Sequence, residues 1–286
     1  MKYEPRIREG LIKTITSDLF EKRRKDIIPI AYEASKEACP LAMSLIRDIA
    51  NTHGFKEIDV FATWYEECWD GTQGCTDFII DGTMYHTNDC DSWDVCCPLE
   101  IGGHFLLLSG GRPSVALSKY GLVFTGNQTD STDTKVGIPR CVLFAEAVLT
   151  ARSIKEAVRT LLNKKRASSY HHLIADVQGN IISLEASATQ HSLKKLNQSI
   201  YVHTNHYMRI PGVEGKKEQS LQESRARYAN VVGCLQKGMP PIDILRTHGI
   251  GGVCRHGEIK TGFACIFTPS QQTIEWHIGH PCGKDD

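Results

Sequence analysis

The chain has 286 residues and a balanced charge, with 33 Lys plus Arg against 33 Asp plus Glu. Without a basic excess, nucleic acid and anionic membranes are disfavoured as main partners, and a small neutral or mixed-charge substrate is favoured instead. The length suits one compact domain, and no linker-like segment divides the sequence.

The first 26 residues are charged throughout and lack the apolar block and cleavage site of a secretory signal. No stretch of the sequence is apolar for long enough to span a bilayer. The 11 cysteines are scattered without a repeating spacing, so most are expected to be reduced, buried thiols. We therefore expect a soluble, cytoplasmic protein.

The first part of the chain, about 55 residues, repeats apolar side chains at helical spacing and predicts a helical layer. From Ile58 the pattern changes to short β-branched and aromatic runs between Gly, Asp and Asn turns, which is typical of strands. Strands are expected in EIDVFATWY, TDFII, TMYHT, GHFLLLS, SVALS and GLVFTG.

The second half begins with two helices, predicted between Ile138 and Leu162, with Ser153 as the N-cap three residues before Glu156. The remaining elements are a hairpin of YHHLIADV and IISLEAS, a strand ending at Val202 to Thr204, a helix over about Ser220 to Gln236, and the strands GFACIFT and TIEWHIG. This order predicts an α+β protein whose sheets pack between helical layers.

The most informative stretch is GTQGCTDFIIDGTMYHTNDCDSW, from Gly71 to Trp93. Autocatalytic peptide cleavage requires the thiol of Cys75 to bend back onto the carbonyl of Gly74, and a side chain at that glycine would obstruct it. After a turn at Asp81-Gly82 the chain returns, so a hairpin would bring Asp89 towards Cys75.

Cleavage before Cys75 would create an α-amino group with an unperturbed pKa of about 7.7 to 8.0, close to the working pH. This amine could act as the base for the thiol of the same residue. Asp89 could accept a hydrogen bond from the ammonium group or orient the thiol. Taken alone, a Gly-Cys pair before a strand also fits an ordinary buried cysteine.

Several motifs occur in a fixed order along the chain: GCT, HTND, YGLVFTGN, VHTNH, a Ser-x-x-Arg-Tyr element, VCRH and GHPC. Together they resemble the acyl-coenzyme A:6-aminopenicillanate acyltransferase-like family of N-terminal-nucleophile hydrolases. The resemblance spans roughly Phe61 to Cys282. Bile salt hydrolase, penicillin V acylase and acid ceramidase are relatives of that family by fold.

The resemblance implies a four-layer αββα sandwich with two stacked antiparallel sheets. It also implies a zymogen in which residues 1–74 form a processed N-terminal segment and residues 75–286 the catalytic chain. The two pieces are expected to remain associated as one compact domain. Assembly of the protein into a homo-oligomer is an alternative that the sequence leaves open.

The resemblance implies that Cys75 is the thiol nucleophile and that Gly74 precedes the cut. Asp89 stands at the family's carboxylate on the second strand. His86 stands where family members carry an Arg or Gln that contacts substrate. A substrate contact is therefore expected at His86, although with altered chemistry.

Asn205 matches the family's oxyanion-hole asparagine, whose amide N–H can contribute about 3 kcal/mol of transition-state stabilisation. Ser118 stands where family members often carry a second Asn, in an Asn-Glu-x-Gly-Leu pattern, so the backbone or another group must replace that donor. Asn127 fits the family's Asn near the substrate pocket. Arg227 matches the arginine that supports the nucleophile, with Arg225 as a rival.

Simpler interpretations of these residues stay open. Asn205 could satisfy a buried loop, and Asp89 could cap a turn, because Asn and Asp are common in turns. Arg225 and Arg227 lie in a charged helical stretch, where a solvated face is the usual explanation.

Cys90, Cys96 and Cys97, together with Cys254 and His256, are candidate metal ligands by residue type. These residues contain no paired Cys-x-x-Cys elements, so the sequence predicts no metal. We expect no cofactor either.

The predicted function is hydrolysis of a linear amide bond in a small N-acyl compound through an acyl thioester on Cys75. One alternative is transfer of the acyl group to an amine, with an amide or a coenzyme A thioester as donor. A second alternative is a nonprocessing homologue that only binds a small ligand.

Overall fold

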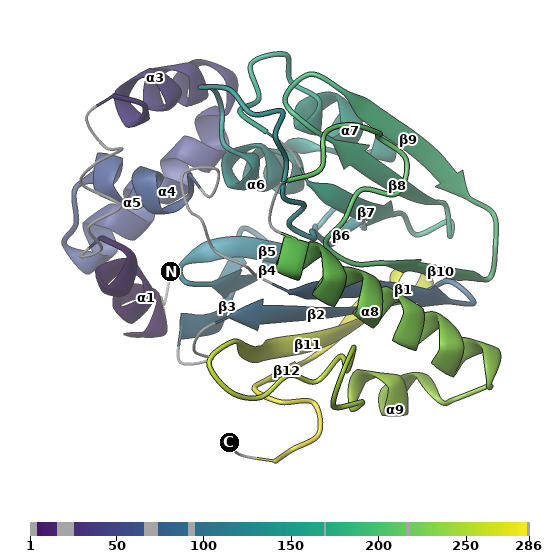
Figure 1. The fold of residues 1–286 in the computed structure, drawn as a ribbon. Helices are drawn as coiled ribbons and strands as arrows, with labels where there is room; N and C mark the ends of the chain where they lie inside the picture. The colour runs from purple at the N-terminus through teal and green to yellow at the C-terminus, as the bar shows by residue number, and fades with distance from the viewer. Residues whose placement is uncertain are drawn as a thin grey trace.

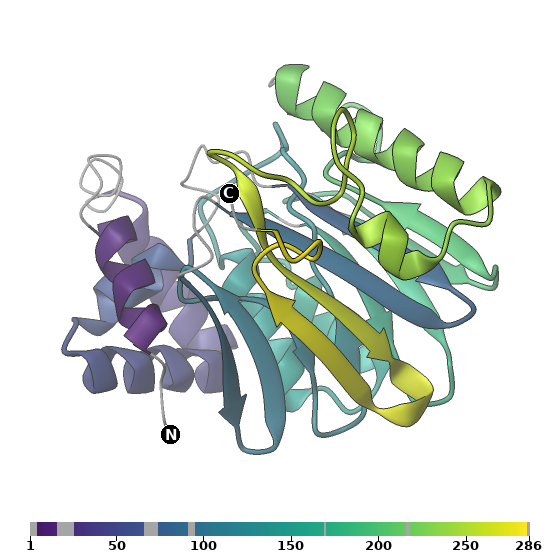
Figure 2. The ribbon, with the colours of Figure 1, turned by 90° about the horizontal axis from the view of Figure 1, so that it is seen from below.

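The computed structural model describes residues 5–15, 26–65, 74–90, 95–168, 170–215 and 218–284. In this part of the chain two antiparallel sheets face each other, and helices cover both outer faces (Figure 1). The view from below shows the N-terminal helices, in purple, at one side of the strands (Figure 2). The α+β sandwich predicted from the sequence is confirmed. Within the described ranges, no helix combines the length and the apolar character needed to cross a membrane.

The first sheet carries the start of the predicted catalytic chain, and its described strands run in the order β10-β1-β2-β11-β12. Asp81 and Gly82 join β1 to β2, and both have positive φ, 47° and 82°, as a tight two-residue hairpin requires. The predicted hairpin is therefore present. The strands are β1 (Cys75–Ile80), β2 (Thr83–Cys90), β10 (Ile200–His203), β11 (Lys260–Thr268) and β12 (Thr273–Ile278).

The second sheet is a meander in which consecutive strands are neighbours, from β3 to β9. Its strands are β3 (Cys96–Ile101), β4 (His104–Ser109), β5 (Arg112–Leu117), β6 (Val123–Phe124), β7 (His171–Ala175), β8 (Ile181–Ala186) and β9 (His191–Leu196).

The helices divide between the two outer faces. On the side of the second sheet, α6 (Arg140–Thr150) and α7 (Ile154–Leu161) cover the strands. Beside them pack α1 (Pro5–Ile15), α3 (Ile28–Ala38), α4 (Pro40–His53) and α5 (Glu57–Thr63). Over the first sheet lie α8 (Glu218–Gln236) and α9 (Pro241–Leu245), and the short 3-10 helix Pro269–Gln271 joins β11 to β12. The hydroxyl of Ser153 accepts the N–H of Glu156, so the predicted N-cap of α7 is confirmed.

The strand predicted over EIDVFATWY is wrong, because Glu57–Thr63 form the helix α5. The short apolar run fits either structure by periodicity alone. Glu57 and Asp59 occupy the first turn, where negative charge interacts favourably with the helix dipole. Val60 and Phe61 are then fully buried in the core shared with α4 and α6.

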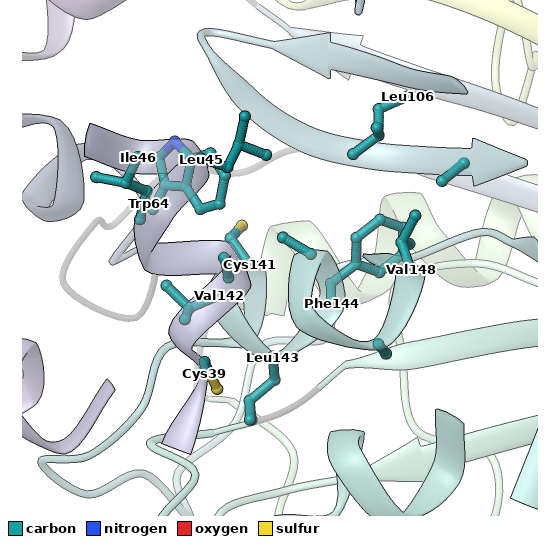
Figure 3. Packing of buried hydrophobic residues seen from close by; sticks show 14 of the residues in the cluster. Cys39, Leu45, Ile46, Trp64, Leu106, Cys141, Val142, Leu143, Phe144 and Val148 are labelled. Carbon is teal, nitrogen blue, oxygen red and sulfur yellow. The ribbon is translucent and has the colours of Figure 1, made fainter. Parts of the chain in front are cut away.

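Two hydrophobic layers flank the second sheet because successive strand residues point to opposite faces. In β4, Leu106 and Leu108 join the core beneath the helices, whereas Leu107 packs between the two sheets. Figure 3 shows Leu106 near Phe144 and Val148 of α6. The hydrophobic packing on both faces holds the second sheet, which faces Cys75, in position.

Phe144 offers a test of this core, since it is fully buried and its ring lies edge-on to Phe124 at 5.8 Å. We expect Phe144→Ala to lower the free energy of unfolding in urea by about 3–5 kcal/mol, because a large cavity is left. The control Ile250→Ala alters a side chain that is 98% exposed, and it should change the free energy of unfolding by about 0.5 kcal/mol or less. Equal effects of the two substitutions would contradict this packing.

Candidate active site

The Gly74–Cys75 junction is held by the neighbouring strand. Cys75 begins β1 and lies opposite Asn88 of β2. The backbone N–H of Asp89 donates a 2.6 Å hydrogen bond to the carbonyl of Gly74. The carbonyl that a thiol would attack is therefore fixed by the same register that aligns β1 with β2.

Gly74 has no room for a side chain. A Cβ built there would collide with the Asp89 carboxylate and would lie 2.8 Å from Nη1 of Arg227 and 3.0 Å from Nη1 of Arg255. Only glycine fits this position with its present neighbours. The sequence suggested glycine here for access of the thiol, whereas the structure shows a cluster of charged side chains that excludes a Cβ.

Asp89 is buried at the centre of that cluster. Its Oδ1 accepts a hydrogen bond from the hydroxyl of Thr261 at 3.1 Å, and its Oδ2 lies 3.4 Å from Arg255 and 3.8 Å from Arg227. Burial raises the pKa of the Asp89 carboxyl, while the two guanidinium groups oppose the shift. Asp89 is thus paired with positive charge rather than serving as a turn cap alone.

Asn205 contacts the other side of the junction. Its Oδ1 accepts the backbone N–H of Cys75 at 2.8 Å and a second hydrogen bond from Nη2 of Arg227 at 2.6 Å. Two donors on one oxygen fix which way the amide points. Its Nδ2 then donates to the carbonyl of Gln128 at 2.8 Å. In this arrangement the predicted oxyanion donor is engaged elsewhere, and Asn205 acts as an acceptor.

The thiol of Cys75 is buried among polar groups. Nδ2 of Asn88 lies 3.4 Å from the sulfur and also donates to Ser114 at 3.1 Å. Burial, followed by the charge of Asp89, raises the pKa of the Cys75 thiol to about 12, while Arg227 and a hydrogen bond from the Gln128 backbone oppose the shift. The thiol is therefore protonated at neutral pH. The sequence had assigned no role to Asn88 or Gln128.

The space beside this sulfur is narrow. A cavity of about 10 Å³, close to the minimum for one water molecule, is bounded by Cys75, Asn88, Ser114, Gln128 and Tyr170. A larger cleft of about 390 Å³ lies on the other side of the cluster, against Arg227 and Arg255.

Arg227 and its rival Arg225 have different surroundings. Arg227 is buried, and its Nη1 lies 3.3 Å from the carbonyl of Cys75. The side chain of Arg225 is 53% exposed and pairs with Glu214. The structure therefore brings Arg227 to Cys75 and leaves Arg225 at the surface.

His86 lies in a buried polar network between the sheets. Its Nδ1 is 2.8 Å from Oδ1 of Asp77, whose Oδ2 accepts a 3.0 Å hydrogen bond from Thr125 and lies 3.6 Å from Nδ1 of His171. Burial lowers the pKa of His171 to about 3. His86 is thus engaged with Asp77, which lies two residues after Cys75 on the same face of β1.

Asn127 and Ser118 have contacts within the scaffold. Nδ2 of Asn127 donates to the carbonyls of His203 and Thr204, both at 3.2 Å, and so holds the backbone just before Asn205. The hydroxyl of Ser118 accepts the N–H of Tyr120 in the turn after β5.

The family model described as acyl-coenzyme A:6-aminopenicillanic acid acyl-transferase matches residues 116–247. The chain resembles this family, as its sequence predicted. The matched stretch contains Asn205 and Arg227. The match covers less than half of the chain and supports a resemblance to an acyl-transferase family. No curated protein is a significant match to the chain.

Solved structures with a similar course include two variants of conjugated bile acid hydrolase from Clostridium perfringens. One is 11% identical, with a TM-score of 0.43 and coverage of 71% of this chain and 89% of that chain. The other is 13% identical, with a TM-score of 0.40 and coverage of 74% and 95%. Penicillin V acylase from Agrobacterium tumefaciens is 10% identical, with a TM-score of 0.39 and coverage of 71% and 82%.

The crowding at Gly74 predicts the effect of an added methyl group. Gly74→Ala should displace Asp89 or the junction itself, at a cost of about 1–3 kcal/mol. If the chain is cut before Cys75, the same cost added to the activation barrier would slow scission by about five- to 150-fold. The rate can be measured by following the intact mass of freshly synthesised protein.

Gly233→Ala is the matched control, because an added Cβ there meets no described atom within 4 Å. Gly233 lies inside α8, so alanine should stabilise the helix by about 0.5–1 kcal/mol and leave scission unchanged. Unimpaired scission in Gly74→Ala would contradict the steric account.

Proposed function

We propose that this chain is a self-processing cysteine amidohydrolase that cleaves linear amide bonds of small N-acyl substrates through an acyl thioester on Cys75. The observation that carries the proposal is that polar partners hold both sides of one peptide bond: Asp89 binds the carbonyl of Gly74, and Asn205 binds the N–H of Cys75.

Processing would begin with attack of the Cys75 sulfur on the carbonyl carbon of Gly74. A C–S bond forms, the C–N bond breaks, and the thiol proton is transferred to the departing nitrogen. Water then hydrolyses the thioester, giving a Gly74 carboxylate and restoring the thiol. The fixed carbonyl and the short tether between thiol and target favour this step by proximity.

Scission would leave the α-amino group of Cys75 beside Asn205, which already accepts the N–H of the same nitrogen. An ordinary α-amino pKa of about 7.7 to 8.0 suits a general base at neutral pH. The amine can then remove the thiol proton, which the buried precursor retains. Arg227 and Asp89 are proposed to hold this arrangement together.

In turnover, the Cys75 sulfur would attack the substrate carbonyl and displace the amine, which takes up a proton from the α-ammonium group. Water would then release the acyl group as a carboxylate. Nδ2 of Asn88 and the backbone N–H of Gln128 already contact the sulfur and are suitable oxyanion donors. Asn205 could join them only by releasing the Gln128 carbonyl.

We propose that His86 and Asn127 act as positioning residues behind the substrate site, since both are fully buried. Ser118 is assigned to the turn that follows β5. The N-terminal segment is proposed to remain bound after scission, because its helices share one hydrophobic core with α6 and the second sheet. The 11 cysteines, an odd number without a repeating spacing, support a location in the reducing cytoplasm.

Substitution of the nucleophile tests the proposal. The wild-type protein should yield two fragments, the second beginning at Cys75, whereas Cys75→Ala should stay whole and inactive because no thiol remains. Intact-mass analysis and amide hydrolysis assays measure both effects. Cys234→Ala, in α8, should behave like the wild type. Scission or turnover in Cys75→Ala would rule the proposal out.

Acyl transfer is the second candidate, because the matching family is described as an acyl-transferase that uses coenzyme A. The two activities share the acyl thioester and differ only in the second step. We expect the free carboxylic acid as the main product with and without an added amine acceptor. A new amide that replaces the acid, with either an N-acyl compound or an acyl-coenzyme A donor, would favour transfer.

A further inference from the structure

Four metal-ligating side chains converge at the edge of the first sheet, where the loop after α9 meets the segment after β12. The loop supplies His248, Cys254 and His256, and the C-terminal segment supplies Cys282. One potential ligand atom from each residue lies within 4.8 Å of those of the other three.

The spacing of these atoms is that of a tetrahedral site. Nε2 of His256 lies 3.7 Å from the sulfur of Cys254 and 3.5 Å from that of Cys282. Zinc bonds of about 2.3 Å to sulfur and 2.0–2.1 Å to nitrogen, at a tetrahedral angle, separate the two ligand atoms by about 3.5 Å. The observed separations need little adjustment.

Hydrophobic packing does not explain the cluster. His248 and His256 are exposed and Cys282 is half-buried, whereas only Cys254 is buried. The ring of His280, which is itself buried, stacks on His256 at 3.7 Å and limits its rotation. Four side chains from two separated parts of the chain thus meet around one point, and the stacked ring of His280 restricts the orientation of His256.

We propose that His248, Cys254, His256 and Cys282 bind one Zn²⁺ ion as a structural Cys₂His₂ site. Binding replaces the two thiol protons, which pass to solvent, by two Zn–S bonds, and two neutral imidazoles complete the coordination. Two thiolates balance the charge of the ion. Sulfur and imidazole ligands in tetrahedral array favour zinc, and four protein ligands leave no position for a catalytic water.

Backbone N–H groups are in place to stabilise the thiolates. The N–H of Lys284 donates to the sulfur of Cys282 at 3.4 Å, and the backbone of Cys282 donates to the sulfur of Cys254. Such outer hydrogen bonds orient metal ligands.

The site would fix the position of Arg255, which lies between two of the ligands. Arg255 pairs with Asp89 at 3.4 Å and with Glu223 at 3.2 Å. Its backbone N–H donates to Thr261, which also binds Asp89. Zinc would therefore anchor both the C-terminal segment and the loop that supports the scissile junction.

Metal analysis of the full-length protein tests the site directly. After synthesis with added zinc and removal of loose metal, the wild type should contain about one zinc per chain. Cys282→Ser and His248→Ala should lose it, while His277→Ala, which changes an exposed histidine outside the cluster, should keep it. Replacement by Co²⁺ should give the sulfur-to-cobalt absorption of a thiolate site in the wild type and His277→Ala only.

Zinc content in the wild type no higher than in Cys282→Ser would overturn the proposal. A Cys254–Cys282 disulfide in the protein as isolated, detected by nonreducing mass analysis, would also overturn it. Both readouts are independent of scission at Gly74. Failure of the metal site and failure of the proposed enzyme function can therefore be told apart.

Discussion

The register between β1 and β2 is the constraint on which the rest of the site depends. It sets Cys75 opposite Asn88 and lets the N–H of Asp89 bind the carbonyl of Gly74. A slip of one residue would exchange the two faces of β1, moving the thiol away from the space between the sheets. The tight Asp81-Gly82 turn fixes this register, so a local feature of the sequence determines the geometry of the proposed chemistry.

The two faces of β1 and β2 carry different kinds of side chains around the Gly74–Cys75 junction. Between the sheets, the thiol meets the neutral donors Asn88 and Gln128. On the helical side, Asp89, Arg227 and Arg255 form a charged cluster against Gly74. Burying such charges costs free energy unless each is paired, and removing one partner is strongly destabilising. The cluster is therefore better understood as a means of positioning the backbone than as a source of stability.

Much of this could be predicted from local patterns. Alternation along the strands, the Asp-Gly turn and the Ser153 cap all depend on neighbouring residues, and the sequence indicated each of them. The prediction failed for α5, because a short apolar run does not separate strand from helix. The orientation of the Asn205 amide and the donors Asn88 and Gln128 depend on contacts between distant segments. The sequence grouped Cys254 and His256 with the wrong cysteines and predicted no metal. Their proximity to His248 and Cys282 depends on the same kind of distant contact.

The proposed scission depends on one intermediate, a thioester that joins the carbonyl carbon of Gly74 to the sulfur of Cys75. Hydroxylamine added to freshly synthesised precursor tests this most directly, because it attacks thioesters much faster than peptide bonds. The account predicts faster scission and an N-terminal fragment that ends in a Gly74 hydroxamate, identified by mass. Unchanged kinetics with only a free carboxylate at Gly74, or a fragment ending at another residue, would contradict it.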